Sequence, residues 1–197
     1  MTFLKHLKVG TSAAAVAMAL TVAAGSAQTL GTAERFSANA IDVNTGRTGT
    51  IEINVDRWST PKERETLTGV LFTKGPQALL DAVRDLRPVG RIHTPGSIGY
   101  ELRYAEERRL PEGDREIILA TDRPMSFWEL TNRTRSADYP FTWVTLRVTP
   151  DGTGKGSLAV AARITGDPDD RTVEVEDYAL QPVRLENVRS QKRNTTN

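Results

Sequence analysis

The segment Arg115–Val148, REIILATDRPMSFWELTNRTRSADYPFTWVTLRV, decides the fold of this chain. It contains two runs with strand character, 116–121 and 141–148, and a long connection between them. Five of the chain's twelve aromatic side chains fall in this segment: Phe127, Trp128, Tyr139, Phe141 and Trp143. Large aromatic side chains dominate the energetics of cores, and Trp and Tyr also need a hydrogen-bond partner for their polar atoms. The connection is therefore predicted to act as a plug that packs against or into a sheet, or to form the bottom of a pocket.

The beginning of the chain has the pattern of a secretory signal peptide spanning residues 1–27. Lys5 and Lys8 supply the positive charge, an apolar or small stretch follows, and Gly25 and Ala27 are the small residues before a cleavage site. The apolar stretch is short and rich in Ala, whereas a membrane-spanning helix needs about 20 strongly apolar residues. The pattern favours cleavage over anchoring. It predicts an exported protein, periplasmic or secreted, with no integral membrane segment after cleavage.

The mature chain is close to electrically neutral and has no cysteine. Removing Lys5 and Lys8 from the 26 Lys and Arg residues leaves 24, against 25 Asp and Glu. This balance argues against nucleic acid as a partner, because a dedicated nucleic-acid binder concentrates a basic excess. The lack of cysteine excludes disulfides, thiol catalysis and thiolate metal sites, and it suits a bacterial periplasm. No cofactor is expected.

A half-buried hairpin is predicted where the ordered domain begins, after a flexible lead-in at residues 28–34. Its strands are 35–43 and 50–58, and a turn rich in Asn, Thr and Gly separates them. In the second strand Ile51 and Ile53 alternate with polar residues, which is the period of a strand with one buried face.

A pair of short helices is predicted after this hairpin. Thr60 can cap the first helix, with Pro61 at its first position and Glu63 completing a capping box. Gly75 is predicted to end this helix and Pro76 to open the second. Each helix has one apolar face, and the pair is expected to pack against the sheet.

The rest of the chain reads as further strands with short turns. They are predicted at 90–94, 99–109, 116–121, 141–148, 155–165, 172–180 and 182–188. In the strand 99–109, Tyr100, Leu102 and Tyr104 are predicted to share one face. The fold class is mainly β (α+β): an antiparallel meander of about eight strands that forms a barrel or a sandwich, with the helical pair inserted after the second strand. One domain is expected at 35–189, with a disordered tail at 190–197.

Several segments together resemble a family of secreted bacterial proteins to which no function is assigned. The resemblance rests on RWST (57–60), KGPQALLDA (74–82), HTPGSIGYELRYA (93–105), LATDRPMSFWE (119–129), DYPFT (138–142) and QPVRL (181–185). It covers nearly the whole mature chain. It implies an exported bacterial protein, and it carries no catalytic residues with it.

The residue types that enzymes use are sparse. His93 is the single His of the mature chain and lies beside a Pro-Gly turn, where a structural role is favoured over a catalytic triad. One His and no Cys make zinc and copper sites improbable, and no acidic turn has the spacing of a calcium loop. Asp122 and Glu129 are the carboxylates that an aromatic cleft could use on a glycan. The favoured alternative is that they pair with Arg123, Arg133 or Arg135 or cap local backbone.

These exclusions leave binding as the preferred function. The sequence predicts a non-enzymatic, ligand- or partner-binding domain that takes a small molecule or an envelope component at the aromatic connection. The candidate ligand-binding residues are Trp128, Phe127, Tyr139, Trp143, Arg123 and Glu129. The alternatives are a secreted carboxylate-dependent hydrolase acting on glycans and a structural component of an envelope assembly. No oligomeric state is specified by the sequence.

Overall fold

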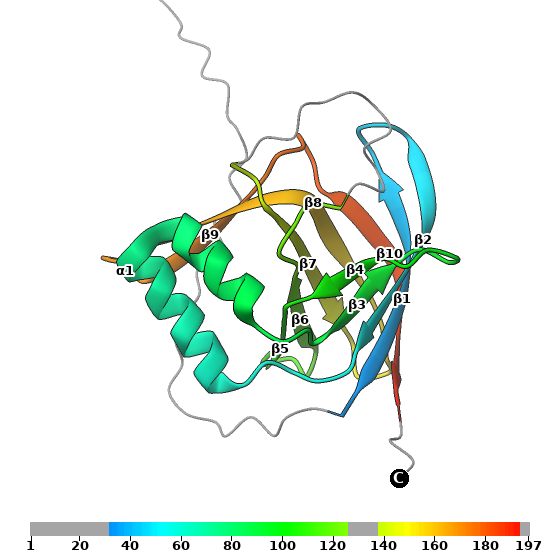
Figure 1. The fold of residues 1–197 in the computed structure, drawn as a ribbon. Helices are drawn as coiled ribbons and strands as arrows, with labels where there is room; N and C mark the ends of the chain where they lie inside the picture. The colour runs from blue at the N-terminus through cyan, green and yellow to red at the C-terminus, as the bar shows by residue number, and fades with distance from the viewer. Residues whose placement is uncertain (1–31, 126–137, 194–197) are drawn as a thin grey trace, which may run out of the picture.

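The computed structural model describes residues 32–125 and 138–193, which form one antiparallel sheet and one helix. The elements in chain order are β1 (Glu34–Asp42), β2 (Arg47–Val55), α1 (Pro61–Asp85), β3 (Gly90–His93), β4 (Tyr100–Leu102), β5 (Tyr104–Arg109), β6 (Arg115–Ala120), β7 (Phe141–Val148), β8 (Thr153–Asp167), β9 (Thr172–Asp177) and β10 (Val183–Lys192). Figure 1 shows that the sheet curls round on itself and that the helix lies outside it. The mainly β class is confirmed.

The sheet is a nearly closed barrel. Its strand order is β4-β3-β2-β1-β10-β8-β7-β6-β5, and β9 pairs with β8 off this path. The two end strands, β4 and β5, are separated in the chain by Arg103 alone. One bent segment therefore forms both edges of the sheet, so that the barrel hypothesis is favoured over the sandwich.

The break at Arg103 explains two differences from the predicted strands. The strand expected at 99–109 is divided in two, which turns the nine predicted strand segments into ten strands among the described residues, so the expected count of about eight is too low. The break also reverses the faces. Leu102 packs into the interior of the barrel, whereas Tyr104 packs outside it, and the prediction that they share a face is wrong. The backbone N–H of Arg103 bonds to the carbonyl of Ala120, which holds the reversal in place.

The barrel interior is filled by apolar side chains. Phe36, Ile51, Leu102, Ile117 and Leu146 are completely or almost completely buried there, together with inward-facing residues of the other barrel strands. The alternation predicted for β2 is confirmed, since Ile51 and Ile53 face this core. Small barrels are stabilised in this way by side chains that fill the lumen.

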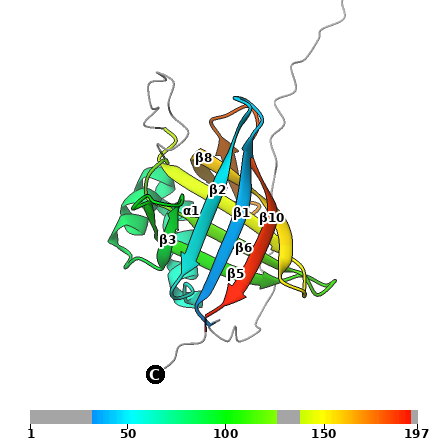
Figure 2. The same cartoon turned by 90° about the vertical axis from the view of Figure 1, so that its right-hand side faces the viewer.

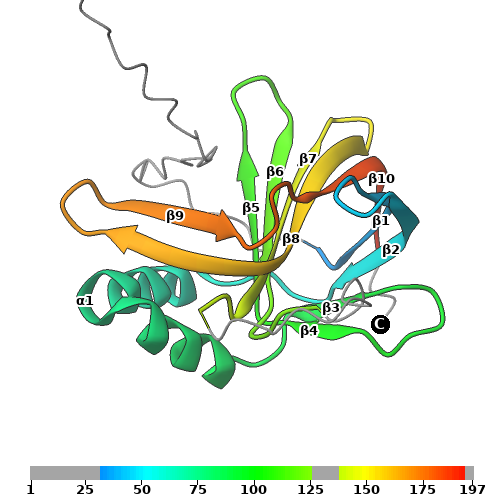
Figure 3. The same ribbon diagram turned by 90° about the horizontal axis from the view of Figure 1, so that it is seen from above.

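A second core lies between α1 and the outer face of the sheet. Leu67, Leu71 and Leu79 of the helix pack with Phe141 and Ile164 of the strands. In Figure 3 the helix runs beside the long hairpin of β8 and β9. The capping box is confirmed: Thr60 accepts a hydrogen bond from the backbone of Glu63, and the Glu63 carboxylate accepts one from the backbone of Thr60.

The helical pair is corrected to one kinked helix. Gly75 interrupts α1 with φ 82° and ψ −175°, a conformation that is almost restricted to glycine. The chain resumes helical geometry at Pro76, so the break lies at the residue where the first helix was predicted to end. The two arms remain one element because no connecting loop separates them.

The ends of the domain differ slightly from the predicted boundaries. β1 begins at Glu34, and β10 continues to Lys192 because Ser190, Gln191 and Lys192 pair with β1. These three residues are therefore strand and not part of a disordered tail. The predicted signal peptide lies outside the described residues. Among the residues that are described, no helix combines the length and the apolar composition needed to cross a bilayer.

Candidate functional site

The predicted binding residues fall into two groups. Phe127, Trp128 and Glu129 lie outside the described residues. Arg123, Tyr139 and Trp143 are described. Each of them contacts a different set of residues, so the three do not form one site. They stand at the two ends of the aromatic connection, so the chain itself places them near β6 and β7.

Trp143 belongs to the second core. It lies on β7 opposite Ala120 and Ala159 and packs on the outer face of the barrel. Its indole N–H donates to the hydroxyl of Thr145 at 3.2 Å. These contacts satisfy both the apolar and the polar needs of the side chain, and they indicate a structural role.

Arg123 lies in the turn that follows β6. Its guanidinium stacks over the ring of Tyr100, 5.3 Å from the ring centre, and its carbonyl accepts a hydrogen bond from the Thr142 hydroxyl. Two residues further on, Met125 is buried in the barrel interior, where its N–H bonds to the carbonyl of Val160. Within the described residues, Met125 is thus the part of the predicted plug that enters the barrel.

Tyr139 forms the centre of an exposed group that we call the tyrosine cluster: Tyr139, Arg163, Glu176 and Tyr178. The rings of Tyr139 and Tyr178 meet edge to face at 5.2 Å, and the Arg163 guanidinium lies 5.3 Å from the centre of the Tyr139 ring. The Tyr139 hydroxyl donates to Glu176 at 2.6 Å, and Arg163 pairs with the same carboxylate. Both hydrogen bonds favour the charged carboxylate and lower the pKa of Glu176, whereas the bond to Glu176 raises the pKa of Tyr139.

The hairpin of β8 and β9 positions this cluster. Beyond Ala162, β8 pairs with β9 as a ribbon, and successive residue pairs alternate between its two faces. Ile164 and Val175 pack toward α1. Arg163 lies opposite Glu176 in the neighbouring residue pair of the ribbon. Their side chains are on the other face, where they form an ion pair. The apolar face thus anchors the ribbon on the helix while the other face presents the tyrosine cluster.

An exposed apolar loop adjoins the cluster. Tyr178 is 45% exposed and Leu180, in the loop between β9 and β10, is 99% exposed. The loop is nevertheless held at several points. The N–H of Tyr178 bonds to the carbonyl of Ala161, and the side-chain amide of Asn44 donates to the carbonyl of Gln181 at 2.7 Å. A fully exposed leucine on a backbone fixed in this way is presented to solvent without a partner among the described residues.

A carboxyl group lies behind this loop in an unfavourable environment. One oxygen of Asp177 accepts the N–H of Ala179 at 3.0 Å, and the other is buried without a hydrogen-bond partner among the described residues. Burial raises the pKa of Asp177 to about 6, with a further contribution from the negative charge of Asp42. Burial acts on Asp42 in the same direction, but hydrogen bonds from Thr45 and Asn44 outweigh it and lower the pKa of Asp42.

Asp122 and His93, the described residues considered for catalysis, are occupied by structural contacts, and Glu129 lies outside the described residues. Asp122 lies 3.5 Å from the Arg103 guanidinium, so it does pair with an Arg, although that Arg is not one of the expected partners, Arg123, Arg133 and Arg135. His93 uses both ring nitrogens, one with the side-chain amide of Asn54 and one with the carbonyl of Thr94. In the part of the chain that the structure describes, no three His, Asp or Glu side chains converge on a possible metal position.

Sequence reasoning did not identify Arg163, Glu176, Tyr178 and Leu180 as site residues. A signal for the first two was present, because a hairpin turning at 168–171 places Arg163 opposite Glu176. Nothing in the local sequence distinguishes Leu180 from a core leucine. Its exposure follows from the course of the loop, which only the folded chain defines.

The fold and this surface define a small barrel-like antiparallel β protein with an anchored, exposed aromatic and apolar surface at one end of the β8–β9 hairpin. Comparison with known proteins adds no relative: no family model, no curated protein and no solved structure matches this chain.

Proposed function

We propose that this chain is an exported, non-enzymatic binding domain that recognises a protein of the cell envelope through the tyrosine cluster and Leu180. The signal-like start of the chain and its resemblance to secreted bacterial proteins support export. The observation that carries the binding proposal is the full exposure of Leu180 on an anchored loop beside a paired Tyr139 and Tyr178.

The chemistry of this surface suits a protein partner. Tyr and Arg are enriched in the energetically important centres of protein interfaces, and an exposed apolar side chain gains free energy when a partner removes it from water. The side chains of the cluster already contact one another before binding, since Glu176 bonds to both Tyr139 and Arg163. Fewer side chains then lose rotamer freedom on association, which lowers the entropic cost of binding.

A small-molecule ligand is less well supported at this place. Small ligands prefer concave sites that bury most of their surface. Two surface hollows of the described residues are lined from β1, β2, β7, β8, β10 and the turns beside them, and no aromatic residue lines either one. The hydrolase alternative is weakened by the pairing of Asp122 with Arg103.

The test compares Leu180 with a matched exposed residue, Ile98, which is 84% exposed in the turn between β3 and β4. A photoreactive amino acid at position 180 or 98 is used in the periplasm of the producing bacterium to capture neighbouring proteins. A protein captured from position 180 alone is then purified, and its affinity for Leu180→Ser, Tyr178→Ala and Ile98→Ser variants is measured by calorimetry.

We expect Leu180→Ser and Tyr178→Ala to weaken binding by about tenfold or more, as truncation of a central interface residue does, and Ile98→Ser to leave it unchanged. Equal affinity of the Leu180→Ser and Ile98→Ser variants would remove this surface from the interface. Identical capture from both positions, or no capture from position 180, would count against a specific partner there.

A further inference from the structure

β10 carries a bulge that reshapes the outer wall of the barrel. Its register with β8 shifts between Leu185 and Val188, so that Glu186 and Asn187 together face Lys155. Asn187 has φ 52°, one of the two positive values among the described residues that are not glycine. Bulges of this kind redirect side chains and are frequent next to binding sites.

A shallow groove lies on the wall at this bulge. It has a volume of about 550 Å³, and its floor and sides come from the ends of β7 and β8 and from the middle of β10. A second hollow of about 390 Å³ shares Asn187 and Arg189 with it and continues across β1 to β2. Figure 2 faces the wall formed by β2, β1 and β10, along which the second hollow lies. The two hollows together form one elongated path that crosses five strands.

The groove carries two cations that have no ion-pair partner among the described residues. Arg147 is paired with two carboxylates: its Nε lies 2.7 Å from Asp114, and a terminal nitrogen lies 3.5 Å from Glu112. Lys155 and Arg189 form no ion pair with any described residue, and Glu186 is the remaining charge in the lining. Lys155, Arg189 and Glu186 together have a net charge of one positive. Lys155 is on β8 and Arg189 is on the adjacent strand β10.

The other lining groups are hydroxyls and amides. Ser37, Asn39, Thr50 and Asn187 supply them along the path. Such side chains both donate and accept hydrogen bonds, which suits a ligand with many hydroxyl groups. The hydroxyls of Thr149 and Thr153 also line the path, but both donate to Asp151 within their own turn and can only accept from a ligand. Guanidinium and ammonium groups between them suit carboxylates.

We infer that this groove binds a linear acidic polysaccharide, with Lys155 and Arg189 contacting its carboxylates and the hydroxyl and amide side chains contacting its sugar hydroxyls. An open, elongated and shallow path fits an extended polymer better than a compact ligand, which requires an enclosed pocket. Single-stranded nucleic acid fits less well, because base stacking needs aromatic side chains and none lines the path. This inference is independent of the proposed protein partner.

Calorimetry with defined oligomers tests the inference on the mature protein. The probes are hexamers of galacturonate and of mannuronate, with neutral maltohexaose and the hexanucleotide of thymidine as comparisons. We expect at least one uronate hexamer to bind, added salt to weaken it, and both comparison oligomers to bind at least tenfold more weakly. No uronate binding, or equal binding of maltohexaose or of the nucleotide, would overturn the assignment.

Charge variants locate the site. Lys155→Gln with Arg189→Gln is expected to weaken uronate binding tenfold or more, whereas Glu186→Gln should strengthen it severalfold because it removes a repulsive charge. The matched control is Arg184→Gln, an exposed cation of the same strand that does not line the groove. If Arg184→Gln weakens binding as much as the double variant, the binding is diffuse attraction and the groove is not the site.

Variants of the bulge separate the shape of the groove from its charge. Asn187→Gly keeps a residue that adopts positive φ easily, and binding should be retained. Asn187→Val places a β-branched side chain in a conformation that it disfavours, and binding should fall severalfold if the bulge shapes the site. Circular dichroism confirms that each variant is folded. Unchanged uronate binding by a folded Asn187→Val protein would contradict the role of the bulge.

Discussion

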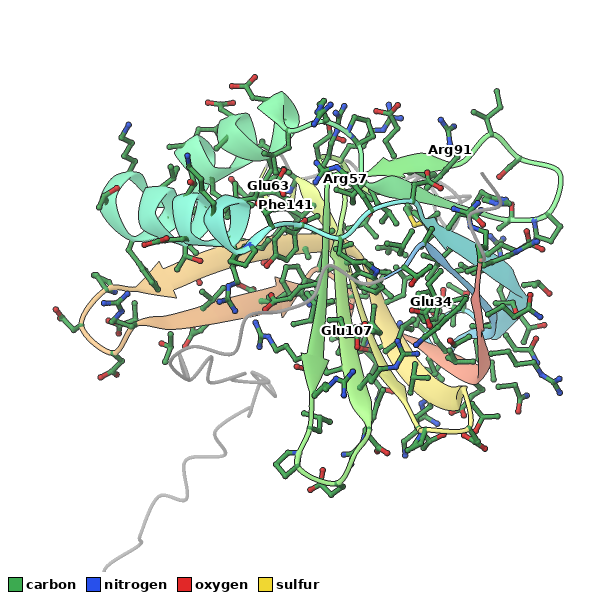
Figure 4. The ribbon with its side chains drawn as sticks, turned by 90° about the horizontal axis from the view of Figure 1, so that it is seen from below. Glu34, Arg57, Glu63, Arg91, Glu107 and Phe141 are labelled. Atoms are coloured by element: carbon green, nitrogen blue, oxygen red, sulfur yellow. The ribbon has the colours of Figure 1, made fainter. Side chains whose placement is uncertain are left out.

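Arg115 on β6 reaches Glu34 on β1 with both of its terminal nitrogens, at 2.7 and 3.0 Å from the two carboxylate oxygens. The Glu34 side chain is only 2% exposed, and it also accepts a hydrogen bond from Ser190. Figure 4 shows Glu34 and Glu107, another partner of Arg115, near the end of the barrel where β1 begins. The pair connects strands that are 81 residues apart in the chain.

Removing Arg115 should therefore destabilise the barrel strongly. Arg115→Met leaves the buried Glu34 carboxylate without its counter-charge, and loss of one partner from a buried pair costs roughly 3–5 kcal/mol. Urea unfolding followed by circular dichroism measures this change. Adding Glu34→Gln to Arg115→Met should recover part of the loss, because the buried charge is then removed.

An exposed pair provides the contrast. Arg193 pairs with Asp56 at the surface, where both side chains are largely in water. Arg193→Ala should lower the free energy of unfolding by less than about 1 kcal/mol. If Arg115→Met lowers the free energy of unfolding by no more than Arg193→Ala does, the Glu34–Arg115 pair contributes no more than a surface ion pair.

Asp177 should make part of the stability pH dependent. Its folded pKa of about 6 lies above its ordinary value near 3.8, so the folded state binds the proton more tightly. Its contribution to stability is fully present below about pH 4 and is lost as the pH rises through 6. Asp177→Asn, which is always neutral, should be more stable than the parent at pH 7 by on the order of 2 kcal/mol.

The comparison must be a difference between the two proteins at each pH. The lowered pKa values of Asp42, Glu63 and Glu106 act in the opposite direction and stabilise the fold as the pH rises. Glu63 and Glu106 are common to both proteins, so their effect cancels. Asp42 interacts with Asp177 through its charge, so the measured difference includes that interaction. A difference between Asp177→Asn and the parent that stays constant from pH 4 to pH 7 would contradict the raised pKa.

Two glycines of α1 should respond oppositely to alanine. Gly75→Ala places a Cβ in a conformation that only glycine adopts easily, and it should destabilise the protein by about 1–3 kcal/mol. Gly69 has helical geometry and open space around the added atom, so Gly69→Ala should stabilise by about 0.5–1 kcal/mol. Thermal unfolding of both variants decides the matter, and a stabilising Gly75→Ala would mean that the kink is dispensable.

Met125 should behave as a core residue although it stands beside a loop. It is 1% exposed inside the barrel, and Met125→Ala should lower the free energy of unfolding by about 2–5 kcal/mol. Met125→Leu preserves the volume and should cost less than about 1.5 kcal/mol. Leu180→Ser is the surface control and should change stability by less than about 0.5 kcal/mol. Equal losses in Met125→Ala and Leu180→Ser would contradict the insertion of Met125.

Much of the fold could be predicted from the sequence, because helix caps, turns and strand alternation depend on residues that are close together in the chain. Thr60, Pro61 and Glu63 predict the start of α1, since a helix cap involves residues three apart. Gly75 predicts its interruption. The alternation in β2 predicts its buried face, because side chains of a strand alternate with a period of two.

The candidate site was harder to predict. Tyr139 was identified as a site residue and lies in the exposed cluster, but Trp143, chosen for the same aromatic character, belongs to the second core. Aromatic side chains serve cores and interfaces alike, so residue type alone does not separate the two. Leu180 was not identified, because exposure is a property of the folded surface.

The sequence by itself determined the local elements and the mainly β class, because capping, turn formation and alternation act over a few residues. Only the tertiary structure decided that the sheet curls into a nearly closed barrel, that Arg103 reverses the faces of Leu102 and Tyr104, and that Arg115 meets Glu34. The physical reason is the distance in the chain. Contacts between strands far apart depend on sheet twist, bulges and the packing of the whole core, and no short segment encodes these by itself.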